Sequence, residues 1–217
     1  MATLGYKIDD FYNLINLSVQ SLLLGFCALF LSFLFALPIG YIYTFKGSFS
    51  KKIISFTIIL LAVLPPFFLS MLLSNLFFHM DIKSGFISLV FAHMIPIYPY
   101  TLILMILGFS FVPQNAIYSA KIYCKNSFAG FYKFYFPFMK NQFLVAILLG
   151  LSISLSQYII TLMLSSPNFS TLMVEIVPFL QSGDLKSAAS YGIVFLINTP
   201  LVLFGIYKVM RLKNGIS

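Results

Sequence analysis

The chain has 217 residues, of which 60% are hydrophobic, 18% aromatic and only 8% charged, and its mean hydropathy is +1.00. Soluble domains carry about 25% charged residues, so these charges cannot cover a water-facing surface, and disorder is excluded because it needs low hydrophobicity. The net charge of +8 would suggest nucleic acid as a partner in a soluble protein. Here the apolar composition decides, and it predicts an integral membrane protein that is surrounded by a lipid bilayer and has no nucleic-acid partner. We expect the fold to be all-α.

Five charge-free stretches predict five transmembrane helices, because about 20 apolar residues cross the hydrocarbon core. We expect these spans at about 14–44, 53–78, 85–109, 142–164 and 187–209. Pro65 and Pro66 fall inside the second span, where prolines break or kink a helix. After the fourth span, Ser-Ser-Pro-Asn at 165–168 is a turn signal. Residues 171–180 are too short to cross, and they predict an interfacial or re-entrant helix before a break at Gln181-Ser182-Gly183-Asp184.

The charged side chains predict the orientation of these spans. All five acids lie in the N-terminal segment, the 79–84 loop or the 165–186 segment. The 45–52 loop, the 110–141 loop and the C-terminal tail contain no acid and most of the basic residues: Lys46, Lys51, Lys52, Lys121, Lys125, Lys133, Lys140, Lys208, Arg211 and Lys213. Because positive loops stay in the cytoplasm, we expect the N-terminus outside and the C-terminus in the cytoplasm.

The sequence offers no recognisable enzyme or metal site. Cys27 and Cys124 lie far apart, as do His79 and His93, so no metal-binding spacing can be written. We therefore expect no catalytic residue, no metal and no cofactor on this chain. His93 is the only ionisable residue inside a predicted span, and we interpret it as a hydrogen-bonded core residue. An ion-coupled carrier would normally need intramembrane acids, and their absence argues against a secondary transporter.

We expect the 110–141 loop to be structured and not a flexible linker. Residues 114–127 contain no Gly or Pro and predict a helix, on which Ala116, Ala120 and Cys124 share one face of small side chains. Such a face lets a partner protein approach the backbone closely. The alternative is an amphipathic helix that rests on the membrane surface. The aromatic-rich stretch 128–138 after it predicts an interfacial belt at the entrance of the fourth span.

This loop resembles the cytoplasmic coupling loop of binding-protein-dependent ABC importer permeases. That motif runs Glu-Ala-Ala, three residues, Gly, nine residues, Ile, one residue, Leu-Pro. When Pro137 is aligned with its last residue, Tyr118, Ser119 and Ala120 take the place of Glu-Ala-Ala. The remaining motif positions fall on Cys124, Phe134 and Phe136. Ala120 and Pro137 match by identity, whereas Tyr118 departs from the motif because it replaces the acid.

The resemblance extends to the run 152–192, and it is closest to the branch that handles thiamine, ferric iron, sulfate or molybdate, and polyamines. It implies that residues 1–217 form a single permease domain of a bacterial-type inner membrane with a coupling helix between spans three and four. It also implies that the chain needs separate ABC ATPase subunits, a second permease subunit that is the same chain or a sister, and an extracytoplasmic solute-binding protein. The coupling segment would then comprise Ala116, Tyr118, Ser119, Ala120, Cys124, Phe134, Phe136 and Pro137.

A stripe of small and polar residues on the fourth predicted span is the first candidate for a solute path. It consists of Gly150, Ser154, Gln157, Thr161 and Ser165. Such residues line a path or pack helices together, and Gln157 is the strongest path candidate because a buried amide needs partners. Asn16 and Gln20 on the first span form a second candidate. The alternative functions are a non-transporting membrane scaffold and a secondary transporter.

Overall fold

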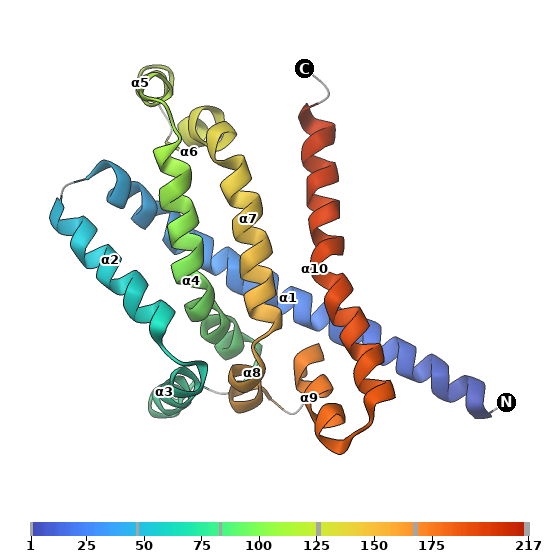
Figure 1. Cartoon of the computed structure of the whole chain (residues 1–217). Coiled ribbons are helices and arrows are strands. Elements are labelled where there is room, and N and C mark those ends of the chain that lie inside the picture. The colour runs from blue at the N-terminus through green and yellow to red at the C-terminus, as the bar shows by residue number, and fades with distance from the viewer. Residues whose placement is uncertain (1, 47, 83, 125–126, 167–168, 215–217) are drawn as a thin grey trace. The chain divides into compact units, whose positions relative to one another are not determined.

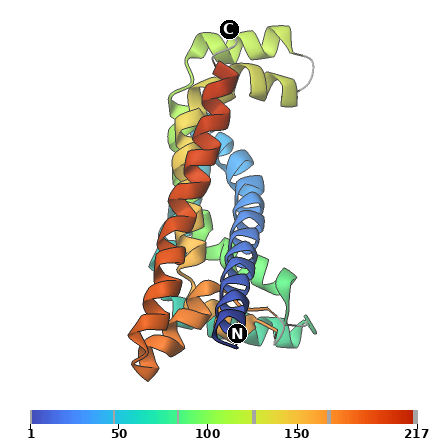
Figure 2. The same ribbon diagram turned by 90° about the vertical axis from the view of Figure 1, so that its right-hand side faces the viewer.

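The computed structural model describes residues 2–46, 48–82, 84–124, 127–166 and 169–214, and every regular element in this part of the chain is a helix. The all-α prediction is therefore confirmed. The helices, which Figures 1 and 2 show from two sides, are α1 (Ala2–Phe45), α2 (Ser48–Val63), α3 (Pro66–His79), α4 (Phe86–Ser110), α5 (Gln114–Tyr123), α6 (Ser127–Gly130), the π-helix η1 (Phe131–Tyr135), α7 (Phe136–Leu155), α8 (Tyr158–Leu164), α9 (Leu172–Ser182) and α10 (Leu185–Asn214).

Among the described residues, three helical stretches are long and apolar enough to cross a membrane, and they suggest a membrane-embedded protein. They are Tyr12–Phe45, Phe86–Ser110 and Phe128–Leu155. The helices α2 and α3 qualify only together, as a broken span or a re-entrant loop. The fifth predicted span coincides with α10, which is not among the three. Five spans and their orientation stay predictions.

Two predicted spans differ from the helices that form. The second is interrupted after Val63, and α3 restarts at Pro66, where a proline in the first helical turn loses no hydrogen bond. The prediction of a single helix at 142–164 is wrong, because α7 begins at Phe136 and ends at Leu155. The aromatic stretch before it is helical too, and its rings stack along the helix, as Phe131 does on Tyr135.

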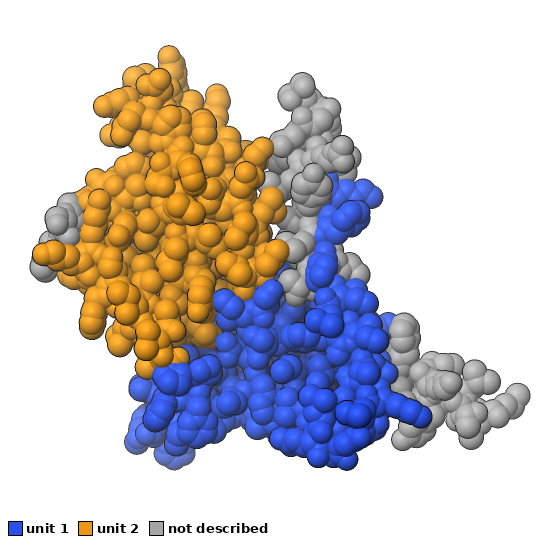
Figure 3. All heavy atoms as spheres, in the orientation of Figure 1, with its two compact units in different colours: residues 1–28, 65–93, 151–217 blue, residues 29–64, 94–150 orange. Residues whose placement is uncertain are grey.

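The chain divides into two compact units, each coloured separately in Figure 3. Unit 1 comprises residues 1–28, 65–93 and 151–217, and unit 2 comprises residues 29–64 and 94–150. Unit 2 is built on an apolar core to which α1, α4, α5, η1 and α7 contribute, with Met105 and Met139 fully buried. Unit 1 has its own buried side chains, among them Leu24, Leu89 and Ile160.

The turn between α9 and α10 follows from two residues. Gly183 has φ +79°, a left-handed conformation that closes a helix readily in glycine. Its N–H donates to the carbonyl of Leu180, and the N–H of Asp184 donates to the carbonyl of Phe179. Asp184 then caps α10 by accepting hydrogen bonds from the N–H and hydroxyl of Ser187, and these bonds hold the pKa of its carboxyl below the ordinary value. The predicted helix is confirmed, and it continues two residues past the predicted Leu180 to end at Ser182.

Candidate functional site

The coupling segment predicted at 114–127 forms a shorter helix. Helix α5 begins after Pro113, which has extended backbone (φ −70°, ψ 150°), and ends at Tyr123. Cys124 has left the helical conformation (φ −117°, ψ 113°), so it does not continue the face of Ala116 and Ala120. Residues 125–126 lie outside the described residues. The prediction of a helix here is confirmed, and its expected continuation through Cys124 is wrong.

The small side chains of α5 face their own unit. Ala120 is 8% exposed and belongs to the core of unit 2, while Ala116 and Ser119 are half-buried. A methyl group placed on Gly130 of α6 would lie 3.4 Å from the Cβ of Cys124 and 3.7 Å from the Cβ of Ala120. The small residues therefore let α6 approach α5 within the chain. Ala120 is therefore covered by its own unit, and its predicted role in ATPase coupling stays a prediction.

The opposite face of α5 is open and partly apolar. Tyr118 is 59% exposed and Ile122 75% exposed. They are four residues apart and therefore adjacent on the helix surface. Lys121, three residues after Tyr118, is exposed beside them. We call Tyr118, Lys121 and Ile122 the outer face of α5, and only Tyr118 among them belongs to the predicted coupling residues.

The other motif residues lie where the chain passes from η1 into α7. Phe134 is half-buried against the core of unit 2, and Phe136 stacks on Tyr132 with ring centroids 5.7 Å apart. Pro137 is exposed at the second residue of α7, directly after the π-helical turn and within the continuous helical stretch Phe128–Leu155. Because α5 packs on η1 and α6, these residues connect α5 to the start of α7. A cavity of about 640 Å³ lies beside this segment and is lined by Leu37, Pro38, Tyr41, Phe109, Ala120, Lys121, Cys124, Phe128, Gly130, Phe131 and Tyr135.

A buried hydrogen-bond network occupies the interior of unit 1. The ring of His93 is 1% exposed, and its Nδ1 lies 2.9 Å from the hydroxyl of Ser154 and its Nε2 3.0 Å from the hydroxyl of Thr161. The Thr161 hydroxyl donates its one proton to the carbonyl of Gln157, so it must accept from Nε2–H of His93. Ser154 accordingly donates to Nδ1. His93 is a hydrogen-bonded core residue, as predicted.

This network lies at the break between α7 and α8. The backbone at Gln157 has φ −76° and ψ 88°, and the N–H of Tyr158 donates to the carbonyl of Ser156. The predicted continuous stripe from Gly150 to Ser165 is therefore interrupted. Of the three predicted path residues, Ser154 and Thr161 are buried and bonded to His93, whereas Gln157 is half-buried.

Gly150, the first residue of the predicted stripe, serves packing within unit 2. A Cβ at this position would lie 1.9 Å from Cδ1 of Leu29, so a larger residue here would displace that side chain of α1.

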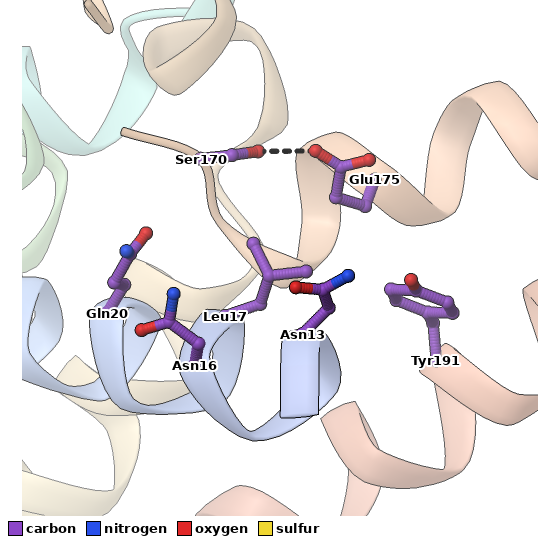
Figure 4. A pocket seen from close by; sticks show the side chains of 7 residues that line it. All are labelled: Asn13, Asn16, Leu17, Gln20, Ser170, Glu175 and Tyr191. Carbon is purple, nitrogen blue, oxygen red and sulfur yellow. Dashed lines mark hydrogen bonds between the residues drawn. The ribbon is translucent and has the colours of Figure 1, made fainter. Parts of the chain in front are cut away.

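A polar pocket of about 330 Å³ lies in unit 1 (Figure 4). Its lining residues come from α1, the segment before α9, α9 and α10: Asn13, Asn16, Leu17, Gln20, Ser170, Glu175 and Tyr191. In Figure 4 the side-chain amides of Asn16 and Gln20 rise from α1 towards Ser170. The hydroxyl of Ser170 donates to Oε1 of Glu175 at 2.8 Å. The predicted pair Asn16 and Gln20 therefore does lie in a pocket.

Two hydrogen bonds and one ring contact join the segments around this polar pocket. The N–H of Leu172, the first residue of α9, donates to the hydroxyl of Ser21 on α1 at 2.9 Å. The side-chain amide of Asn198 on α10 approaches the Ser18 hydroxyl at 3.4 Å. The rings of Phe179 and Tyr191 lie 5.2 Å apart and join α9 to α10. Sequence reasoning missed Glu175 and Tyr191 because only the fold brings them to Asn16.

No model of a known protein family matches the chain, and no curated protein matches its sequence. Within the part of the chain that the structure describes, no group of three or more His, Cys, Asp or Glu side chains comes together.

Proposed function

We propose that the chain is a membrane-embedded transport subunit, and in particular the permease subunit of a binding-protein-dependent ABC importer in a bacterial-type inner membrane. Its partners in this proposal are ABC ATPase subunits, a second permease subunit and an extracytoplasmic solute-binding protein. ATP hydrolysis takes place on the ATPase, so the permease itself performs no bond chemistry.

Helix α5 is the observation that carries the proposal. It is a separate ten-residue helix between two stretches that are long enough to span a membrane, Phe86–Ser110 and Phe128–Leu155. The residues that resemble the coupling motif begin on this helix and end at Pro137. The outer face of α5 offers exposed apolar surface for a partner.

The packing of α5 also supports a coupling role. It contacts η1 and α6, which lead directly into α7. A displacement of α5 by a closing ATPase dimer would therefore act on α7, whose last residues before the break at Gln157 hold the hydrogen bond to His93. This path connects an ATPase contact with the part of the chain where the helix is discontinuous.

The proposal predicts that Ile122→Asp weakens ATPase binding. The side chain is 75% exposed, so the substitution leaves the fold intact, yet it places a charge in the centre of an apolar contact. We expect at least a tenfold loss of affinity, which corresponds to about 1.4 kcal/mol. The measurement is the amount of ATPase that copurifies with the tagged chain. The ATPase is the one encoded beside this chain's gene, and the two genes are expressed together.

The matched control is Ile82→Asp, in the loop that follows α3. Ile82 is also exposed, and the predicted orientation puts it on the side of the membrane away from the ATPase. It should retain the partner. If the unmodified chain copurifies with no ATPase, the importer assignment fails and a scaffold or secondary transporter remains. If Ile122→Asp binds like Ile82→Asp, α5 is not the docking helix.

A further inference from the structure

The polar pocket of unit 1 has the chemistry of a site for a positively charged ligand. Glu175 carries the only charge among its seven lining residues. Asn13, Asn16 and Gln20 supply amide oxygens that accept hydrogen bonds, and Tyr191 supplies an aromatic ring. A carboxylate attracts a cation, amide oxygens accept from its N–H groups, and an aromatic face binds it through the ring quadrupole. The same set offers no positive side chain to an anion.

The size of the polar pocket indicates an organic ligand. Its volume of about 330 Å³ lies at the lower end of the range for small-molecule sites. A water molecule takes about 30 Å³ in the liquid, so the space is much larger than a bare metal ion needs. A divalent cation would also gather several carboxylates, whereas only one lines this pocket. The open shape leaves Asn13 and Asn16 accessible from outside the protein.

The pocket is built to hold this arrangement. The hydroxyl of Ser170, which also lines the pocket, donates to Oε1 of Glu175 at 2.8 Å and fixes one oxygen of the carboxylate. The bond between Leu172 and Ser21 ties the start of α9 to α1 at the level of Gln20. The polar groups thus converge from segments that are anchored to one another, which lowers the cost of ordering them on binding.

We propose that this pocket binds a small organic cation, an ammonium compound with a second hydrogen-bonding group, whose ammonium contacts Glu175. Its identification as the transported solute rests on the proposed importer function, in which the predicted orientation places the pocket on the extracytoplasmic side. The binding itself does not depend on an ATPase.

Three molecules of equal length test the role of charge. The full-length protein in lipid nanodiscs is titrated calorimetrically with 4-aminobutan-1-ol, which is a cation, with neutral 1,4-butanediol and with anionic 4-hydroxybutanoate. We expect the cation to bind at least tenfold more tightly than the diol, and the anion to give no binding. Equal affinity for the cation and the diol, or tighter binding of the anion, overturns the proposal.

Glu175→Gln tests the residue. Glutamine keeps an oxygen that accepts from Ser170 but removes the charge, so the thermal midpoint should stay unchanged while affinity for 4-aminobutan-1-ol falls at least tenfold. The matched control is Asp81→Asn, which removes an exposed acid from another loop and should not alter binding. Asparagine also tolerates the positive φ of 54° at that position. Undiminished binding by Glu175→Gln overturns the proposal.

A second variant decides the matter if Glu175→Gln fails to fold. Asn16→Leu changes an exposed pocket residue of similar size and should also weaken binding of the cation at least tenfold. Retained affinity in a folded Asn16→Leu protein then overturns the proposal. If the protein binds the cation but no ATPase partner is found, the proposal for the pocket is supported and the importer assignment fails. An ATPase complex that binds no cation supports the importer assignment and overturns the proposal for the pocket.

Discussion

His93 fixes the geometry of a broken helix through two hydrogen bonds. Its neighbours Ser154 and Thr161 lie on either side of the break at Gln157, so one ring spans the discontinuity within unit 1. Non-helical backbone at membrane depth is tolerated only where protein surrounds it or water fills a cavity. Here the hydroxyl of Thr161 satisfies the carbonyl of Gln157 at 2.6 Å. The polar residues of this segment thus stabilise an irregular backbone.

Replacing this histidine should lower stability. His93→Phe leaves the hydroxyl of Ser154 buried without its partner, and an unsatisfied buried polar group costs about 1–3 kcal/mol. We expect a lower midpoint of thermal unfolding in detergent. His79→Phe changes the other histidine, which is exposed, and should alter stability by less than about 0.5 kcal/mol. Equal midpoints for the two variants would show that the network is not stabilising.

At the scale of elements, the sequence predicted those helix ends that are set by nearby residues. The third predicted span, 85–109, agrees with α4, and α9 ends inside the predicted break 181–184, at the left-handed Gly183. The break after Leu155 was missed because Ser156 and Gln157 are not helix breakers. The side chain that bonds to both sides of this break, His93, precedes Ser154 by 61 residues in the sequence, so no local pattern contains it.

The end of α5 was missed for a related reason. Nothing in the local sequence stops a helix at Tyr123, but Cys124 and Ala120 pack against Gly130. Contacts of this kind follow from how α5 and α6 fold against each other, and helix propensity does not contain that information.

The inward orientation of Ala120 gives a prediction about α5. Ala120→Arg places a cation where the apolar core of unit 2 meets the cavity beside α5, among mostly apolar side chains where an unpaired charge is costly. We expect a clear decrease of the thermal midpoint, corresponding to about 2 kcal/mol or more. Tyr118→Arg, on the outer face of the same helix, should leave the midpoint nearly unchanged. If the two variants are equally stable, Ala120 does not pack as described.

At the scale of the whole molecule, the charge distribution predicts an orientation that the two native cysteines can test. Cys124 should react with a maleimide only when the reagent reaches the cytoplasm, since it follows α5 in the predicted cytoplasmic loop. Cys27 should stay unreactive within α1. The variants Cys27→Ala and Cys124→Ala assign the labelled site. Labelling of Cys124 in intact cells by an impermeant maleimide would reverse the predicted orientation.

Part of the polar pocket could be predicted from the sequence. Asn16 and Gln20 stood out because carboxamides are unusual in an apolar helix. Glu175 did not, since an acid in a predicted loop needs no explanation, and only the fold places it opposite α1. A solute path along Ser154 and Thr161 stays a prediction, and their common partner His93, which lies more than 60 residues earlier in the chain, could not be assigned from the sequence.

The direction in which α5 faces depends on the number of residues in the π-helical turn η1. The N–H of Phe136 bonds to the carbonyl five residues back, on Phe131, where an α-helix would bond four back. Deleting one residue here would restore an α-helical register and rotate everything before η1 by about 100° around the α7 axis. The outer face with Tyr118 and Ile122 would then point a quarter of a turn away. In this segment an insertion or deletion of a single residue therefore decides which side chains meet a partner, even when every residue type on α5 is unchanged.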